Sequence, residues 1–462
     1  MADSTPCRSL LPQRPLRGFS HPGLAIAAPY VTIAIYPDDY VIYSLPQLVK
    51  FARSHSCFYR RWYADVPSHG WQLADLPTVD PAEFWRGADS PDSWPVLTGS
   101  IDDGYLFKTG GSTGDGKLSV YTHTEWVTFT RLFGQQLAAW LRPGDRVANL
   151  FFAGDMYASF LFIHHALLSS GVPVCELPLT GRIDLATLAG AIATYRATVL
   201  AGLPAQFVAF CDWLERNQRI LPTVQRLLYG GESLHKDQRE RIARVFPSAN
   251  VASIGCASVD AGLIGISDPR DPPDVHRIFS RHAHLEILDE ASGEQIEAPG
   301  QPGLLVVTNL FRTLMPIIRF PTGDLASWNG ALGEQARAFT LHGRAGTSHW
   351  IRVGAISLLP NQVGALVTEH TGTQDWQLHL RRTEMGDELE LQIASDHPGI
   401  HATGATLGDR LCEAIRPLAA ACRNHQIRIR VRVVPVQTLV THPRSGKRMQ
   451  VVDHRHMASH IL

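Results

Sequence analysis

Between residues 145 and 257 the sequence alternates short apolar runs with longer amphipathic segments, and this alternation limits the possible folds most. The apolar runs, typical of buried strands, are DRVANLFF, VPVCELPL, ATVLAG, VQRLLYGGE and NVASIGCA. The segments that separate them have the apolar spacing of helices. A strand–helix rhythm of this kind predicts a doubly wound, mostly parallel sheet. Ligands of such sheets bind at the carboxyl ends of the strands, where AGLP, GGES and CASVDAG lie.

The regions on either side of this alternation have different patterns. Apolar spacing predicts helices over 44–63 and 123–141, and Asp80 followed by Pro81 predicts the start of another helix. From residue 283 the pattern indicates strands, and beyond residue 344 it predicts a hairpin, a helix over 408–422 and a last strand. We therefore expect an α/β protein of two domains. Residues 1–344 would form a large N-terminal domain, with mostly parallel doubly wound sheets and a β-rich subdomain, and residues 345–462 a small, mobile C-terminal α+β domain.

Composition excludes several classes of function. A formal net charge of −1 over 462 residues argues against nucleic acid or an acidic membrane surface as a partner. The seven cysteines are scattered and lack the spacing of a zinc site or a disulfide framework. The N-terminus lacks the apolar core of a signal peptide, and no apolar run approaches the roughly 20 residues of a membrane span. We expect a cytoplasmic protein without a membrane partner.

The stretch KTGGSTGDGKLSVYT, residues 108–122, concentrates glycine, serine and threonine ahead of a lysine. Successive backbone N–H groups without side chains form a nest for an anion, and Lys117 adds a positive charge. The Walker pattern is not met, because Leu118 stands where its hydroxyl residue should be, and the dinucleotide fingerprint lacks its acidic residue. From this loop alone, a phosphate nest and a plain surface turn are equally good interpretations.

Five further motifs follow in order, namely YGGESL, ASVDAG, IIRFPTGDLASW, GRAGTSHWIRVGAISLLP and PRSGKRMQVVD. Together with the glycine loop, this set resembles the adenylate-forming superfamily of acyl-CoA synthetases, luciferases and peptide-synthetase adenylation domains. Within it, the chain most resembles the phenylacetate–CoA ligase-like group, and the resemblance covers nearly the whole chain. It implies an enzyme of two steps. A carboxylate attacks the α-phosphate of ATP, which gives an acyl-adenylate and pyrophosphate, and an acceptor then displaces AMP.

The resemblance also implies which residues bind ATP. The glycine loop would cradle the β- and γ-phosphates, the GGE turn would contact adenine, and the aspartate of RFPTGDLA would accept hydrogen bonds from the ribose hydroxyls. Two arginines would lie near the nucleotide. The residues assigned to ATP in this way are Thr109, Gly110, Gly111, Ser112, Thr113, Gly114, Lys117, Gly230, Gly231, Glu232, Ser258, Arg319, Asp324 and Arg344.

Two residues are assigned to catalysis by the same resemblance. Asp260 of ASVDAG falls at the position of an acidic Mg²⁺ ligand, and Lys447 matches the mobile-domain lysine that neutralises charge while the carboxylate attacks. Lysine is scarce, with five in the whole chain, which makes one inside a motif less often a chance occurrence.

The acyl site is expected near FFAGDMYASFLFIHH, residues 151–165, where aromatic side chains could flank an aryl acid. An aromatic stripe at helical spacing is equally typical of plain core. Of the adjacent His164 and His165, at most one should border the substrate, because neighbouring helical residues point to different faces. The substrate residues assigned here are Phe152, Tyr157, Phe160, Gly202, Cys256 and Ala257.

Several positions depart from the family pattern. Residues 346–348 replace an acidic hinge, residues 353–355 displace a glycine of the CoA tunnel, and Val259 and Cys256 replace a hydroxyl and an aromatic residue. We expect ATP and Mg²⁺ as cofactors and CoA or a carrier-protein thiol as the acceptor. A nitrogen nucleophile, nitrite activated to diazotise an aryl amine, and a non-catalytic nucleotide-binding paralogue are the alternatives. A homodimer is compatible with the sequence.

Overall fold

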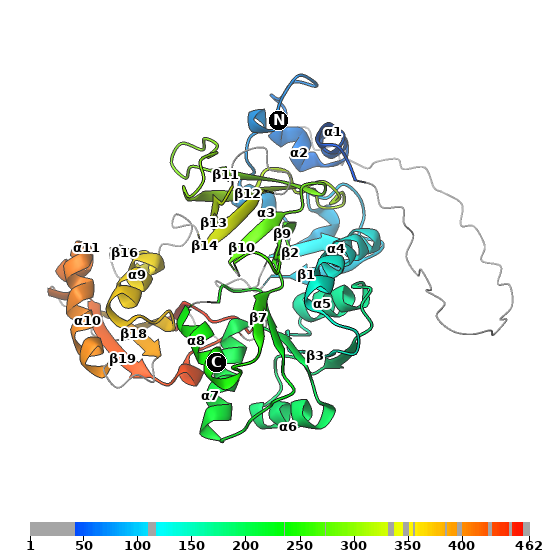
Figure 1. Cartoon of the computed structure of the whole chain (residues 1–462). Coiled ribbons are helices and arrows are strands. Elements are labelled where there is room, and N and C mark those ends of the chain that lie inside the picture. Colours follow the sequence, from blue (N-terminus) through cyan, green and yellow to red (C-terminus); the bar gives the residue numbers. More distant parts are fainter. Residues whose placement is uncertain are drawn as a thin grey trace, which may run out of the picture. The chain divides into compact units, whose positions relative to one another are not determined.

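The structure, a computed structural model of the chain, describes residues 42–109, 117–234, 236–272, 274–330, 337–344, 351–353, 356–383, 386–394, 400–423, 427–442 and 446–455 (Figure 1). All of them lie in one of the two compact units of the chain, residues 40–462. None of the helices in these ranges combines the length and the apolar character that crossing a lipid bilayer requires.

The strand–helix alternation forms a five-stranded sheet in which every neighbouring pair is parallel, in the order β4-β3-β5-β6-β7. This confirms the predicted doubly wound sheet. The order reverses between β3 and β5, so the topological switch point, where such sheets bind ligands, lies at the carboxyl ends of these two strands. The strands are β3 (Arg146–Asn149), β4 (Cys175–Pro178), β5 (Val199–Gly202), β6 (Arg226–Tyr229) and β7 (Asn250–Ser253).

Helices cover both faces of this sheet because alternate strand residues point to opposite sides. Val147 and Val199 pack in one core cluster with residues of α4 and α5, whereas Ala148 and Leu200 pack in another with residues of α6, α7 and α8. A short 3₁₀ turn (Ala138–Trp140) ends α4. The helices are α4 (His123–Leu137), α5 (Ser159–Leu168), α6 (Leu185–Tyr195), α7 (Pro204–Arg216) and α8 (Lys236–Val245).

The single helix expected over 44–63 is in fact two helices, α1 (Leu45–His55) and α2 (Cys57–Trp62). The break falls at the buried Ser56, whose hydroxyl donates to the Pro95 carbonyl at 3.0 Å and accepts from the Tyr59 N–H at 3.2 Å. The short helix α3 (Pro81–Trp85) begins as predicted, with the Asp80 carboxylate accepting from two backbone N–H groups. Two 3₁₀ turns (Leu73–Asp75 and Pro91–Ser93) complete this region.

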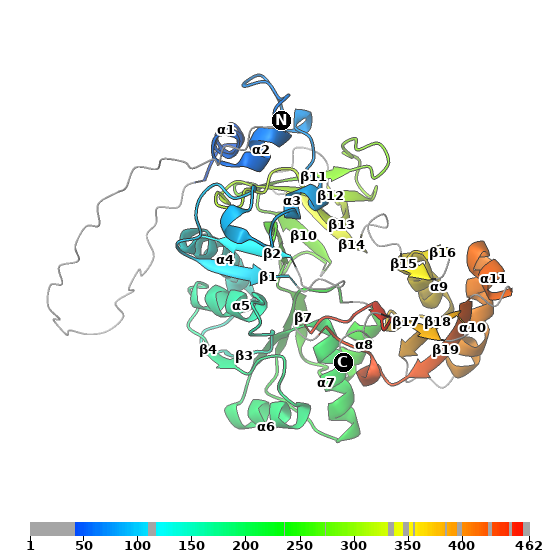
Figure 2. The ribbon, with the colours of Figure 1, turned by 180° about the vertical axis from the view of Figure 1, so that it is seen from behind.

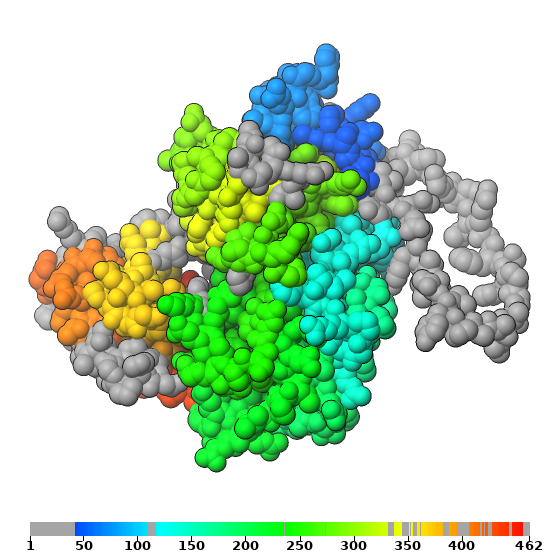
Figure 3. Space-filling view, viewed as in Figure 1, coloured from blue at the N-terminus to red at the C-terminus, as the bar shows by residue number. Residues whose placement is uncertain are grey.

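The expected β-rich subdomain is a seven-stranded antiparallel sheet in the order β11-β12-β13-β14-β10-β9-β8. One face packs against α1, α2 and α3 (Figure 2). In the space-filling view, its residues lie directly against those of the five-stranded sheet and its helices (Figure 3). Its strands are β8 (Cys256–Ser258), β9 (Gly262–Ile266), β10 (Val275–Ile278), β11 (Ala283–Leu288), β12 (Gly303–Asn309), β13 (Phe320–Trp328) and β14 (Ala338–Arg344).

The C-terminal segment, residues 351–455, contains the predicted hairpin as β17 and β18, within a sheet ordered β19-β18-β17-β20. The helix expected over 408–422 is broken at Ile415, because Pro417 has no N–H to donate to the carbonyl four residues earlier. The elements are β15 (Ile351–Val353), β16 (Ile356–Leu358), α9 (Pro360–Thr371), β17 (Trp376–Thr383), β18 (Gly386–Ala394), α10 (Ile400–Ala414), α11 (Arg416–Arg423), β19 (Ile427–Val434), a 3₁₀ turn (Val436–Thr438) and β20 (Val451–Asp453).

Candidate active site

The glycine loop connects the two strands of an antiparallel hairpin, β1 (Tyr105–Lys108) and β2 (Leu118–Tyr121). The Thr109 N–H donates to the Lys117 carbonyl, and the Lys117 N–H donates to the Thr109 hydroxyl, both at 2.9 Å. These bonds hold the two ends of the loop together. The exposed Lys117 ammonium lies 5.6 Å from the centre of the Trp85 ring. The remaining predicted loop residues, Gly110, Gly111, Ser112, Thr113 and Gly114, lie outside the described part of the chain.

The same hairpin is tied to the segment that carries Asp260. The hydroxyls of Ser119 and Tyr121 both donate to the Val259 carbonyl at 2.7 Å. The Arg312 guanidinium donates to the Asp260 carbonyl at 2.9 Å and lies 3.6 Å from the centre of the Tyr121 ring. Burial raises the pKa of the Tyr121 phenol, which therefore keeps its proton as a donor. The structure thus brings the base of the glycine loop and the predicted Mg²⁺ ligand together.

Arg312 was not among the predicted residues. It is fully buried, and it also donates to the Val120 carbonyl, so it joins strand β2 to the Asp260 segment. Its only signal in the sequence is a lone arginine within the apolar run NLFRTLMP. The predicted Ser258 has a local role here, since its hydroxyl accepts from the Ala261 N–H at 2.8 Å.

The predicted ribose and arginine residues separate into different environments. Asp324 lies half-buried in β13, opposite Arg344 of β14, and its N–H donates to the Thr322 hydroxyl at 3.1 Å. The side chain of Arg344 lies outside the description. Arg319 is buried, and its Nε and Nη2 donate to the Glu286 carboxylate at 3.0 and 2.8 Å.

Arg319 therefore has structural partners within the protein, and its contact with the nucleotide stays a prediction. It also donates to the carbonyls of Ala74 and Leu76, so it joins β11 to the turn ahead of α3. Burial raises the pKa of the Glu286 carboxyl, and the hydrogen bonds from Arg319 oppose this by favouring the charged form.

The lysine of the C-terminal motif lies over the GGE turn. A Cβ atom added to Gly231 would be 3.3 Å from Cε of Lys447 and 3.7 Å from its Nζ. Gly231 also has a φ of +80°, which favours glycine. The next residue, Arg448, donates its backbone N–H to Glu232 Oε1 at 2.9 Å across 216 positions of sequence. The amino-acid sequence shows only the order of the YGGESL and PRSGKRMQVVD motifs along the chain, and the structure shows that they are in contact.

Glu232 supplies the acidic side chain at the contact between these two motifs. Burial raises the pKa of its carboxyl, while the positive charges of Lys447 and Arg448 and the backbone N–H groups of Arg448 and Ala205 act in the opposite direction. Gly230 precedes it at the end of β6, and its N–H donates to the Gly202 carbonyl at 3.2 Å. This bond fixes the turn against β5, next to the topological switch point.

The predicted substrate residues lie partly beside a cavity and partly in the hydrophobic core. Phe152, after β3, borders a cavity of about 190 Å³ that Gln206 and Gly446 also line. Gly202 ends β5, and an added Cβ would lie 2.9 Å from Oε1 of the same Gln206. Phe152 also belongs to the core cluster of α4 and α5. Tyr157, Phe160 and Ala257 pack against the same cluster, and Cys256 is half-buried in β8.

The two adjacent histidines both have protein partners. His165 Nδ1 accepts from the Trp126 indole N–H at 2.7 Å, and burial lowers the pKa of its ring. His164 is exposed, and its Nδ1 lies 2.6 Å from the Glu176 carboxylate. The altered hinge residues 346–348 and the displaced glycine at 354 lie outside the described residues.

Among the described residues, no three His, Cys, Asp or Glu side chains gather in a way that would hold a metal ion. Mg²⁺ fits the site in another way, because it commonly binds through one or two carboxylates together with the phosphate oxygens of the nucleotide. Asp260 supplies one such hard oxygen donor beside the glycine-loop hairpin. A single carboxylate at this place is compatible with a metal ion that protein and ATP would hold jointly.

Comparison with known proteins places the chain in a family. The sequence model of the AMP-binding enzyme family matches residues 75–313, more than half of the chain. A phenylacetate–coenzyme A ligase of Thermus thermophilus is 25% identical over 393 residues, which cover 81% of this chain and 85% of that protein. A phenylacetate–coenzyme A ligase of Pseudomonas putida is 23% identical over 368 residues, which cover 75% and 79%.

A solved structure shows the same fold. It is a 2-hydroxyisobutyryl-CoA ligase in the postadenylation state, in complex with R3-HIB-AMP, with a TM-score of 0.65 and 17% identity over 89% of this chain and 88% of that one. The resemblance drawn from the motifs is confirmed. The chain belongs to the AMP-binding enzyme family, and within this adenylate-forming superfamily it is an ATP-dependent ligase of the phenylacetate–CoA ligase-like group.

Proposed function

We propose that the protein converts a small carboxylic acid, aryl or short acyl, into an acyl-adenylate with release of pyrophosphate, and passes the acyl group to the thiol of CoA. The observation that carries this proposal is the position of Lys447 at the Gly231–Glu232 turn. A cation from a C-terminal motif lies where the strands of the doubly wound sheet end. Ligands of such sheets bind at this edge, and adenylyl transfer needs positioned positive charge there.

In the first step, the chain's own residues position the reactants and neutralise charge. Lys447 would lie beside the α-phosphate as negative charge develops on its oxygens. Glu232 lies beside this lysine, and the positive charge of Lys447 counteracts the rise that burial causes in the pKa of the Glu232 carboxyl. Asp324 would accept hydrogen bonds from the ribose hydroxyls. Asp260 would hold Mg²⁺, which when bound neutralises the charge of the phosphates.

Two further features support a carboxylic acid as the substrate and CoA as the acceptor. The relatives from Thermus and Pseudomonas are named phenylacetate–coenzyme A ligases, and the solved neighbour carries an acyl-adenylate. In this chain the cavity beside Phe152, of about 190 Å³, is comparable with the roughly 150 Å³ that a benzene-sized guest needs.

We propose that residues 345–462 form a lid domain, which carries Lys447 to the site for adenylation and withdraws it for the second step.

A pyrophosphate-release assay with a panel of aryl and short acyl acids, with and without CoA, tests this function. Lys447→Ala should lower substrate-dependent pyrophosphate release by at least a hundredfold and leave the Kd for ATP within threefold. Lys50→Ala changes an exposed lysine of α1 and serves as the matched control. A wild-type protein that binds ATP but releases no pyrophosphate with any acid would refute the proposal.

The acceptor is identified in the same assay. If CoA thioester forms at the rate of AMP release, the thiol acceptor is established. If pyrophosphate is released with an acid but AMP appears only after an amine is added, a nitrogen nucleophile takes the acyl group instead. Turnover that requires nitrite together with an aryl amine would indicate activation of nitrite.

A further inference from the structure

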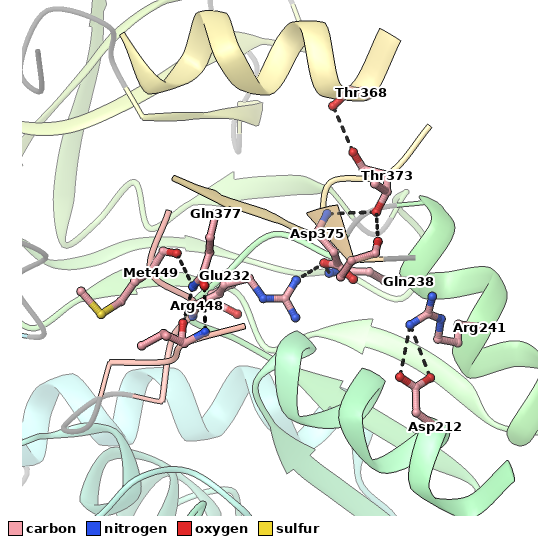
Figure 4. Close-up of polar contacts among 12 residues, drawn as sticks. Asp212, Glu232, Gln238, Arg241, Thr368, Thr373, Asp375, Gln377, Arg448 and Met449 are labelled. Carbon is pink, nitrogen blue, oxygen red and sulfur yellow. Dashed lines mark hydrogen bonds and ion pairs between the residues drawn. The ribbon is translucent and has the colours of Figure 1, made fainter. Parts of the chain in front are cut away.

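Arg448, the residue after Lys447, makes two different contacts at once. Its backbone N–H donates to Glu232, beside the GGE turn, and its guanidinium forms an ion pair with Asp375 (Figure 4). Asp375 immediately precedes β17 and is only 2% exposed. A carboxylate this deeply buried needs partners for its charge, so the side chain of Arg448 is fixed rather than free to move.

The loop that carries Lys447 is also held to β17 directly. The buried Gln377 side chain accepts from the Val440 N–H at 2.8 Å and donates to the Met449 carbonyl at 2.6 Å (Figure 4). The Asp375 N–H donates to the Thr373 hydroxyl at 3.1 Å. The loop, Asp375 and β17 are therefore braced together within the C-terminal segment.

Gln238 connects this braced group to the doubly wound sheet. It lies in α8, is 6% exposed, and donates its Nε2 to Asp375 Oδ1 at 3.0 Å. The Asp375 carboxylate thus contacts two parts of the chain. Arg448 connects it to the loop that carries Lys447, called the lysine loop below, and Gln238 connects it to helix α8. Val208 of α7 adds an apolar contact with the C-terminal segment, but that contact has no preferred direction.

We propose that Gln238 is a positioning residue for adenylation. Through Asp375 and Arg448, it sets where the lysine loop docks and thereby places Lys447 at Gly231. A neutral amide suits this role, because it orients the carboxylate without the strong attraction of a second cation and so releases it for the following step. The inference rests on the proposed two-step function.

The test is a Gln238→Leu variant assayed by acid-dependent ATP–pyrophosphate exchange. We expect kcat to fall about tenfold, since a lost hydrogen bond to a buried carboxylate is of the order that changes a rate by this factor. The KM for ATP should stay within twofold of wild type. Glu240→Gln, at an exposed position of the same helix, is the matched control and should leave kcat unchanged.

A double-mutant cycle separates positioning from a merely structural role. If Gln238 acts through Lys447, Gln238→Leu should cause no further loss of exchange in a Lys447→Ala background. An additive loss in that background would contradict the proposal, and so would a single Gln238→Leu variant with wild-type kcat. Gln238→Glu keeps the shape of the side chain but faces Asp375 with a like charge, so it should lose more activity than Gln238→Leu.

The two proposals fail in distinguishable ways. Absence of exchange in the wild-type protein would refute the proposed function. Normal exchange in both the wild type and the Gln238 variants would refute the positioning role alone. Thermal unfolding of each variant controls for folding. If Gln238→Leu does not fold, Gln238→Glu decides, and unchanged exchange in that variant overturns the inference.

Discussion

Gly446 offers the sharpest test of how the lysine loop closes on the site. It precedes Lys447, has a φ of +66°, and lies close to the Phe152 ring. A Cβ atom added there would lie 2.6 Å from Phe152 Cδ2 and closer still to Cε2 and Cζ, whereas real Cβ contacts essentially never fall below 3.0 Å. Gly181 also lies close to this ring, since a Cβ atom added to it would be 2.6 Å from Phe152 Cδ2. The ring therefore has little room to move away.

Two costs follow for Gly446→Ala. A left-handed backbone conformation costs a residue other than glycine about 1–3 kcal/mol. The overlap with Phe152 forces the loop outward, at about 1–3 kcal/mol for an overpacked contact. Both costs fall on the docked loop, so they oppose the arrangement that places Lys447 at Gly231. Together they predict a fall in the adenylation rate of about thirtyfold or more.

The assay is acid-dependent ATP–pyrophosphate exchange, with two matched variants. Gly372→Ala, at the end of α9, has a φ of +71° and no atom within 4 Å of its added Cβ, so it carries the backbone cost alone. It should lower stability slightly and leave exchange within twofold of wild type. Phe152→Ala combined with Gly446→Ala removes the overlap and should recover at least threefold over Gly446→Ala alone.

If Gly446→Ala exchanges pyrophosphate within twofold of wild type, the docked loop is not the adenylating arrangement. An equal loss in Gly372→Ala would show that backbone strain in the C-terminal segment, rather than contact with Phe152, controls the rate. Failure of the double variant to recover would exclude the ring as the obstacle.

Two further predictions concern pH. Burial lowers the pKa of His276 to about 4 from its ordinary 6.5, so the unfolded chain binds the proton more readily between these values, and stability should fall as pH drops through this window. His276→Gln should flatten that decline in urea unfolding at pH 7 and 5, and an unchanged slope would contradict it. Burial raises the pKa of Glu232, whose negative charge attracts Lys447. Protonation of Glu232 at low pH removes this attraction, so the rate of pyrophosphate exchange should fall as the pH decreases. Glu232→Gln should remove that acid limb from the pH–rate profile, and a limb that persists would assign it to another group.

Elements with local causes could be predicted from the amino-acid sequence alone. The strands of the parallel sheet were found from runs of apolar residues, and the start of α3 from Asp80, whose carboxylate caps N–H groups two and three residues away. The antiparallel hairpin of β17 and β18 followed from its alternation. The family followed from motifs in a fixed order, since each motif is a short stretch of backbone with its own shape.

Features that depend on distant partners could not be predicted in this way, because those partners meet only in the folded chain. The break between α1 and α2 occurs at Ser56, whose partner Pro95 lies 39 positions away. Arg319, expected at the nucleotide, is engaged by Glu286. The residues that hold the site, Arg312 and Gln238, have no motif around them.

The physical reason is that a polar side chain takes its role from the group it reaches, and burial makes that choice energetically decisive. Lys447 could be assigned from PRSGKRMQVVD. That it lies beside Gly231, with its neighbour Arg448 held by Asp375 and Glu232, depends on chain segments more than 70 and 200 residues away that meet only in the folded protein.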